Sequence, residues 1–306
     1  MALSQGTDKE KLKELASLVQ DYLMLQKRIS QIESWMEAVG KDGRVHGKVI
    51  TNGAVTGRMT HSSPNMAQIP NSSSIYGPEC RECWTVEDGN VLVGCDASGL
   101  ELRMLAHYMR DEGYVRTVTE GSSKDGTDVH TVNQRAAGLS TRDNAKTFIY
   151  AFLYGAGDGK IGSIVGGTAK DGARLKAKFL EQTPALRKLL ERVSKQAAKG
   201  WVPGLDGRRI WVRSEHAALN SLLQGAGAIV MKKALVIFDN KVKANKWPVK
   251  YVANVHDEFQ LECPKDIAEE VGKAARMSII EAGEYFKLRC PLDGEYKIGR
   301  NWKETH

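Results

Sequence analysis

The segment Val249–Cys263 most restricts how this 306-residue chain can fold. Apolar residues stand at 249, 251, 253 and 255, then at 259, 261 and 263, and His256-Asp257-Glu258 separates the two series. A period of two is typical of β-strands with one buried face. The segment therefore predicts two strands joined by a tight acidic turn that carries Asp257.

A second acid follows a shorter apolar run. Val91–Cys95 lies between Gly89-Asn90 and Asp96, as expected for a buried strand that ends in a carboxylate. Asp96-Ala-Ser-Gly99 then leads into a helix predicted from Leu100 to Arg110. The carboxyl end of a strand is a common position for a metal ligand, but Asp is also a frequent N-cap. From these residues alone, both interpretations of Asp96 stay open.

The segment 142–155 predicts a helix with one unusual side. At about 100° per residue, Arg142, Lys146 and Tyr150 share one stripe and Tyr154 lies beside them. The apolar residues face elsewhere: Phe148, Ile149 and Phe152. The stripe is either a solvated surface or a surface that grips a polyanion and stacks a flat base. Ser140-Thr-Arg-Asp143 resembles a capping box that starts this helix.

Three further segments matter for function. Residues 8–38 predict one long amphipathic helix whose apolar stripe must pack on the chain or on a partner. The Gly-, Ser- and Pro-rich stretch 41–83 predicts a long loop, whose polar residues contact nucleic acid or only solvent. A largely apolar helix over 217–239 carries Asn220 and Gln224 on one face, where these amides either find core partners or read a groove. The glycine-rich stretch 155–162 predicts a helix stop and a flexible turn.

Composition sets the remaining bounds. The chain is 42% apolar, as in folded proteins, and its net charge of +7 permits a polyanionic partner without requiring one. Five cysteines fit reduced thiols, and the isolated Cys80-x-x-Cys83 lacks the second ligand pair that zinc would need. We find neither an apolar run of membrane-spanning length nor a signal-peptide pattern, so we predict a cytosolic protein.

Asp96 and Asp257 suggest a chemistry when they are considered with the cationic helix between them. Hard divalent cations prefer carboxylate oxygens, and two such ions can bridge an attacking hydroxyl and a departing pyrophosphate. Cationic side chains then neutralise the triphosphate. Sequence spacing does not show whether the two acids meet.

Three motifs resemble those of family A DNA polymerases. Asp96-Ala-Ser-Gly-Leu-Glu-Leu-Arg103 resembles motif A, Arg142-x-x-x-Lys146-x-x-x-Tyr150-x-x-x-Tyr154-Gly155 resembles motif B, and Val255-His-Asp-Glu258 resembles motif C. The match is closest to the replicative polymerases of T-odd bacteriophages. It implies an α+β fold: a palm of antiparallel sheet and helices, over residues 46–110 and 216–306, interrupted by helical fingers over 111–215. Residues 1–45 would be the last helix of a thumb.

The resemblance also implies roles for individual residues. Asp96 and Asp257 would hold two Mg²⁺ ions, with the Ala97 carbonyl as a further ligand. The triphosphate of the incoming dNTP would be bound by Arg142, Lys146 and His130, and Lys146 would donate a proton to pyrophosphate. Tyr150 would stack near the nucleotide, Tyr154 would lie by the templating base, and Glu101 with Tyr150 would exclude ribonucleotides. Primer–template DNA would be contacted by four residues: Arg58, Asn220, Gln224 and His256.

Two other functions are considered. Single-subunit phage RNA polymerases share the architecture, but their motifs differ at Glu101, Tyr150 and Glu258. A catalytically silent DNA-binding subunit would not need two acids beside phosphate. The T-odd phage enzymes also carry a 3′–5′ exonuclease domain and a full thumb that binds a processivity factor. No proofreading carboxylate cluster precedes Asp96, so we expect no exonuclease in this chain. Either the chain is a fragment, or it is the polymerase half of a naturally divided enzyme in which a separate chain supplies the thumb and exonuclease. The role of His306 stays open.

Overall fold

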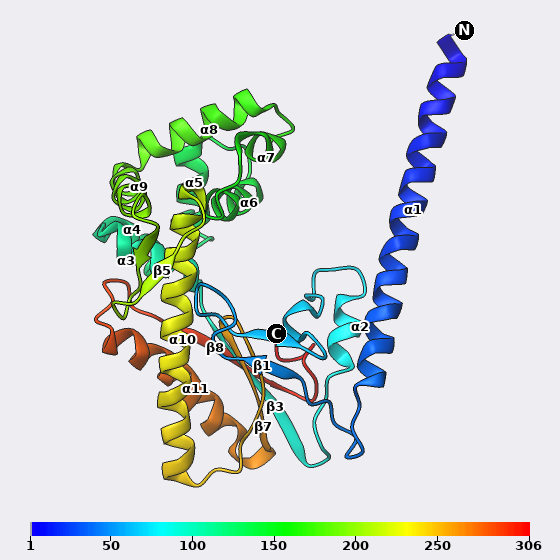
Figure 1. The fold of residues 1–306 in the computed structure, drawn as a ribbon, viewed down its shortest axis with the longest axis vertical. Helices are drawn as coiled ribbons and strands as arrows, with labels where there is room; N and C mark the ends of the chain where they lie inside the picture. Colours follow the sequence, from blue (N-terminus) through cyan, green and yellow to red (C-terminus); the bar gives the residue numbers. More distant parts are fainter. Residues whose placement is uncertain (1) are drawn as a thin grey trace.

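A four-stranded antiparallel sheet forms the centre of the computed structural model, which describes the backbone from Ala2 to His306 and the side chains from Asp8 (Figure 1). The strand order is β6-β7-β3-β8. Their bounds are β3 Asn90–Ala97, β6 Lys250–Val255, β7 Glu258–Pro264 and β8 Gly294–Gly299. The two strands predicted around Asp257 are thus β6 and β7, and the predicted α+β fold is confirmed.

Two long helices cover one face of this sheet. α11 (Ala268–Tyr285) packs on β3 and β8, and α10 (Ala218–Asn245) packs against α11 (Figure 1). The apolar run of β3 fits this position, because Val93 and Cys95 are completely buried. The region Glu215–Asn245 has the length and hydropathy of a membrane span, contrary to the sequence-based prediction, but 61% of its 18-residue apolar stretch is buried inside the fold.

Short elements cover the other face, where the sequence predicts only a long loop. They are β1 (Lys48–Ile50), β2 (Thr60–Ser62), the 3₁₀ helix η1 (Met66–Gln68) and α2 (Gly77–Glu82). A small apolar cluster holds them against the sheet, and it contains Trp35, Ile69, Cys80, Leu92 and Trp302. Since this cluster draws on distant parts of the chain, local sequence patterns did not reveal it.

The segment from Leu100 to Ala197 forms a helical lobe beyond the sheet (Figure 1). Its helices are α3 Leu100–Met109, α4 Glu112–Glu120, α5 Val129–Ala137, α6 Arg142–Leu153, α7 Asp158–Ser163, α8 Ala169–Gln182 and α9 Pro184–Ala197. A hairpin of β4 (Trp201–Pro203) and β5 (Arg209–Trp211) leads back to α10 through η2 (Glu215–Ala217), and η3 (Lys265–Ile267) precedes α11. The predicted flexible turn at 155–162 is wrong in part, because it contains α7.

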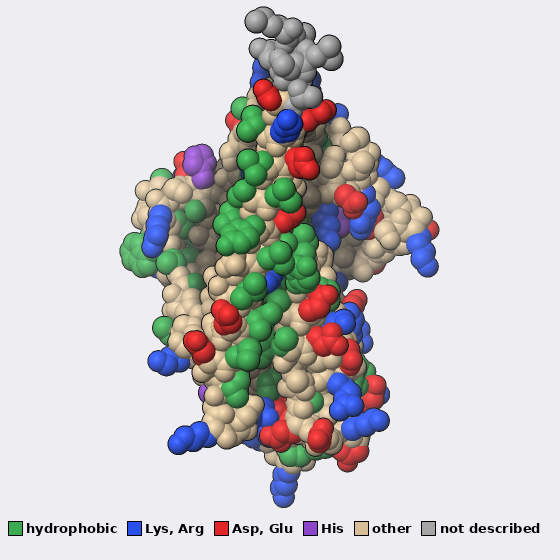
Figure 2. Space-filling model, turned by 90° about the vertical axis from the view of Figure 1, so that its right-hand side faces the viewer, with side chains coloured by type: hydrophobic (Ala, Val, Ile, Leu, Met, Phe, Trp, Pro, Cys, Tyr) green, Lys and Arg blue, Asp and Glu red, His purple; other side chains and the backbone are tan. Residues whose placement is uncertain are grey.

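The first helix, α1 (Ala2–Glu37), extends away from the body and exposes a long apolar band (Figures 1 and 2). Seven of its apolar residues alternate at spacings of three and four: Leu15, Leu18, Tyr22, Leu25, Ile29, Ile32 and Met36. Their exposed fractions run from 36% at Ile32 to 70% at Met36. A 3-4 repeat is the pattern of helices that pair with another helix, and the described part of the chain leaves this apolar band exposed.

Candidate active site

The two predicted acids meet at adjacent strand ends. In the β3–β7 register Asp96 lies opposite Glu258, and the Ala97 N–H donates to the Asp257 carbonyl at 3.0 Å. Both acids and Ala97 line one open cleft of about 340 Å³. The residue before α3 is Gly99, in the left-handed region with φ 56°. Asp96 is therefore not the N-cap of that helix, and its carboxylate is available to the cleft.

The electrostatics of these acids favour a cation. Desolvation by the surrounding protein raises the pKa of Asp96 from 3.8 to about 7, with further contributions from the charges of Asp257 and Glu258. Burial also raises the pKa of Asp257. Their oxygens are hard donors of the kind that Mg²⁺ prefers. Among the side chains described from Asp8 to His306, no group of three or more His, Cys, Asp or Glu gathers as a metal site. The remaining ligands would have to come from backbone, water or phosphate.

A buried polar network lies directly beside Asp257. Glu258 accepts hydrogen bonds from Gln260 and from Trp302 Nε1, the latter at 2.6 Å. His306 Nδ1 lies 3.2 Å from Glu258 Oε2, so the last residue of the chain does reach the edge of the site. Burial would raise the pKa of Glu258, but the hydrogen bonds from His306, Gln260 and Trp302 lower it overall. Glu258 is thus held as a carboxylate.

Helix α6 presents its cationic and aromatic stripe as predicted. Phe148 and Ile149 are completely buried, which fixes the opposite side of the helix in the core. Lys146 is exposed and has no ion pair with any residue that the structure describes. The cap is Thr141, whose side chain accepts from the Asn144 N–H, so the helix begins one residue later than a capping box at Ser140 would start it.

Arg142 is not free, which the sequence did not show. Its Nη2 and Nε lie 2.9 and 3.1 Å from Oδ1 of Asp128. Burial would raise the pKa of Asp128, but the hydrogen bonds from Arg142, Thr131 and the His130 N–H lower it to about 2. The pKa of His130 is lowered by burial and by the positive charge of Arg142. Its Nδ1 is buried without a hydrogen-bond partner among the described residues, and its ring lies 6.3 Å from that of Tyr150.

Glu101 connects two of the predicted residues at the mouth of the cleft. Its carboxylate accepts from Tyr154 Oη at 2.8 Å and from Arg58 Nη2 at 3.2 Å. The rings of Tyr150 and Tyr154 lie 6.3 Å apart, and both tyrosines line the cleft with Glu101. Burial raises the pKa of Tyr150 and of Tyr154, so both phenols stay neutral and can donate hydrogen bonds.

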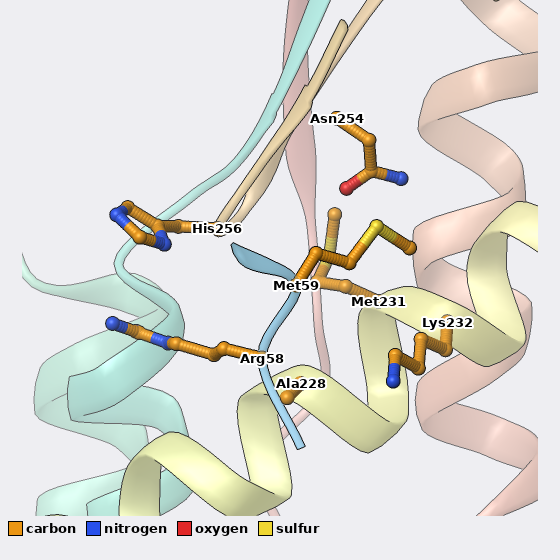
Figure 3. Close-up of a pocket in the computed structure, with 7 residues that line it drawn as sticks. All are labelled: Arg58, Met59, Ala228, Met231, Lys232, Asn254 and His256. Atoms are coloured by element: carbon orange, nitrogen blue, oxygen red, sulfur yellow. The ribbon is translucent and has the colours of Figure 1, made fainter. Parts of the chain in front are cut away.

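Arg58 and His256 extend side by side from different parts of the chain (Figure 3). Arg58 follows the segment 51–57, and His256 occupies the β6–β7 turn with φ 58°. The pKa of His256 is lowered because the protein removes water from around the imidazole and because the charge of Arg58 is nearby. A Lys232 side chain on α10 holds the same segment, because its Nζ donates to the Thr51 carbonyl at 2.5 Å and to Asn52 Oδ1 at 2.6 Å.

Asn220 and Gln224 lie half-buried on α10. Neither side chain has a hydrogen bond to any other residue of the described chain, which removes the core interpretation of these amides. Sequence reasoning missed three residues that shape the site: Lys232, Asp128 and Trp302. A lysine inside a largely apolar helix was the available signal for Lys232, whereas nothing local indicates the partners of Asp128 and Trp302.

Comparisons with known proteins agree with this arrangement. The DNA polymerase family A model matches residues 3–304. DNA-directed DNA polymerases of Enterobacteria phage T3 and Escherichia phage T7 are each 46% identical to this chain over 326 residues. Each alignment covers 94% of this chain and 46% of the phage protein, so the chain spans about half the length of these curated relatives.

A solved structure shares the fold. The POL domain of Pol1 from M. smegmatis, in complex with DNA primer-template and dNTP, superposes with a TM-score of 0.81 at 25% identity. The match covers 90% of this chain and 51% of that chain.

Proposed function

Because this chain belongs to DNA polymerase family A, we propose that it carries out template-directed DNA synthesis, in which a primer 3′-hydroxyl attacks the α-phosphate of a dNTP and pyrophosphate leaves. One observation carries the proposal. Asp96 and Asp257, which are far apart in sequence, line a single cleft that also contains the α6 aromatics Tyr150 and Tyr154. Phosphoryl transfer needs carboxylates for metal ions on one side of the substrate and cations for phosphate on the other.

The acids would hold two Mg²⁺ ions, with the Ala97 carbonyl as a further ligand. When bound, the ions would activate the primer hydroxyl and neutralise charge on the phosphates. Limited hydration and mutual repulsion of the two carboxylates leave a site that gains from positive charge. The Asp96 and Asp257 carboxylates lie at strand ends, which would hold the bound ions in defined positions.

The triphosphate would lie along the exposed side of α6. Lys146, which has no ion pair among the described residues, would bind the phosphates and donate a proton to the leaving pyrophosphate. His130 and Arg142 would contact the same group. Since Arg142 is already paired with Asp128, a phosphate would share or replace that partner.

Selection of the nucleotide would depend on Glu101 and the two tyrosines. Tyr150 would stack near the sugar and base, and Glu101 would occupy the space that a 2′-hydroxyl needs. Tyr154 would lie by the templating base. Its hydrogen bond to Glu101 would link the position of that base to the exclusion of a 2′-hydroxyl. Arg58, His256, Asn220 and Gln224 offer hydrogen-bonding groups to the primer–template without reading its sequence.

Primer extension with the chain alone tests this function against both alternatives. Extension with dNTPs but poorly with rNTPs supports a DNA polymerase. Efficient use of rNTPs supports an RNA polymerase, and DNA binding without extension in Mg²⁺ supports a silent subunit. The variant Asp257→Asn should lose nearly all extension while it still binds DNA, and retained extension would contradict the catalytic assignment.

The apolar band of α1 supports a second part of the proposal. A separate chain that carries the remaining thumb and the exonuclease would cover the band, and a processivity factor would act on that assembly, in the cytoplasm of an infected bacterium. The assay mixes this chain with the unmatched part of the T7 relative and measures product length. Leu18→Asp on the band should prevent any gain in product length, whereas the control Gln20→Asp on another face should not. Equal products from both variants would contradict the docking.

A further inference from the structure

The β4–β5 hairpin has one face in the core and one in solvent. Val202 and Ile210 are each 1% exposed and point inward. Because strand residues alternate, Trp201, Arg209 and Trp211 point outward. Trp201 and Trp211 lie directly opposite each other in the register, so their rings share the outer face. This outer face of the hairpin is a two-tryptophan platform.

The platform carries more apolar surface than a solvated hairpin needs. Trp211 is 61% exposed, although an indole gains more from burial than almost any other side chain. The Arg209 guanidinium lies over the Trp201 ring, 4.9 Å from its centroid. Arg213 and Lys199 are also exposed nearby, and the adjacent acid Glu215 is engaged by Ser194. Exposed rings among cations are the composition of surfaces that bind single-stranded nucleic acid.

The two ends of the hairpin approach segments that border the cleft. At one end of the hairpin, Arg208 Nη1 is 3.3 Å from the position of a Cβ on Gly57, next to Arg58. At the other end, Trp211 precedes His216 by five positions, which limits their separation to about 17 Å. The His216 carbonyl lies 2.4 Å from a Cβ position on Gly155, the residue after Tyr154. The hairpin therefore connects the Arg58 side of the cleft with the end of α6.

We propose that the two-tryptophan platform stacks an unpaired base of the template strand that has not yet reached the cleft, with Arg209 and Arg213 on its phosphates. The inference rests on the proposed function, since it needs a template. Every base has a flat face, so stacking on Trp211 tolerates any sequence, as copying requires. It would hold the incoming single strand in line with Tyr154.

Binding measurements with two primer–templates test the inference. They share one duplex and differ in the 5′ template overhang, which is one nucleotide in one and eight in the other. Trp211→Ala should weaken binding of the long-overhang DNA by roughly 5- to 150-fold and leave binding of the short-overhang DNA unchanged. Trp211→Phe, which keeps a stacking ring, should restore most of the affinity. The control is Tyr285→Ala, because Tyr285 is similarly exposed at 62% but lies on α11.

The outcomes separate the inference from the proposed function. An equal loss on both DNAs would place the contact on the duplex and overturn the inference, as would no loss on either. A loss with Tyr285→Ala equal to that with Trp211→Ala would also overturn it, because the effect would then follow from any exposed ring. Failure of the unaltered chain to bind either DNA would instead count against the polymerase function.

Discussion

Replacing Asp257 with Asn should abolish primer extension and yet stabilise the protein when it is free of metal and substrate. Asp96 has its pKa raised to about 7 by limited hydration and, next, by the charge of Asp257. An acid whose pKa is raised by folding destabilises the folded state as pH rises from its unfolded value through the folded one. As pH rises through 7, Asp96 becomes charged beside Asp257, and Asp257→Asn removes this repulsive neighbour.

The size of the gain follows from the same shift. One pKa unit corresponds to 1.36 kcal/mol, but the Asp96 side chain contacts solvent, so only part of the shift becomes stability. We expect about 1 kcal/mol at pH 8, which corresponds to an increase in Tm of roughly 2–4 °C. At pH 5 the carboxyl of Asp96 is mostly protonated and the difference should shrink towards zero. Mg²⁺ should raise the Tm of the unaltered protein and have less effect on the variant.

Thermal unfolding at pH 5 and pH 8, with and without Mg²⁺, measures these changes. The control is Asp125→Asn, because Asp125 is exposed and has no ion pair with the residues that the structure describes. A lower Tm for Asp257→Asn at pH 8, or the same gain at both pH values, would refute the like-charge argument.

Three other predictions have defined outcomes. Glu101→Ala should raise the ratio of rNTP to dNTP incorporation, and an unchanged ratio would count against a steric role. Extension by the chain alone should be distributive and steeply salt-dependent, with affinity falling roughly 10³-fold between 50 and 200 mM salt if six phosphates are contacted; long products from single encounters would contradict this. Gly155→Ala should cost more than about 2 kcal/mol in denaturant unfolding, because φ is 73° and the new Cβ would lie 2.4 Å from the His216 carbonyl, whereas Gly159→Ala meets nothing within 4 Å.

The strands and the faces of the helices were predictable because a period of two or 3.6 is a local property. The stripe on α6 and the turn at Asp257 belong to this class. The meeting of Asp96 with Asp257 was not a local property, and only the resemblance of three ordered motifs pointed to it. No local sequence pattern predicts the ion pair between Arg142 and Asp128, since it depends on how α5 packs against α6.

The glycine-rich segment after α6 shows a different reason for error. Glycine is usually a sign of a turn, and the sequence therefore predicts one there. In the structure, a Cβ on Gly172 would lie 1.9 Å from the Asp158 carbonyl, and a Cβ on Gly162 would lie 1.9 Å from the Thr168 carbonyl. These glycines permit the close packing of α7 on α8. The same residue type thus serves a turn in one place and helix packing in another, which only the tertiary structure distinguishes.

The polar face of β7 explains how the fold keeps the two acids together. Glu258, Gln260 and Glu262 alternate along this strand, and all three are buried, although the sequence pattern predicts a strand with one buried face. Each has its own partners: Trp302 donates to Glu258 at 2.6 Å, Thr305 donates to Gln260 at 2.9 Å, and Arg44 lies 2.6 Å from Glu262.

A slip of two residues between β3 and β7 would keep the apolar face inward, so apolar burial alone does not define the register. The slip would, however, move Glu258 and Glu262 away from their donors and leave buried carboxylates unpaired, at a cost of about 3–5 kcal/mol for each broken pair. The register that satisfies these groups is the one that sets Glu258 opposite Asp96 and so brings Asp257 to its side. The buried polar residues therefore fix the relative position of the two acids on which metal binding would depend.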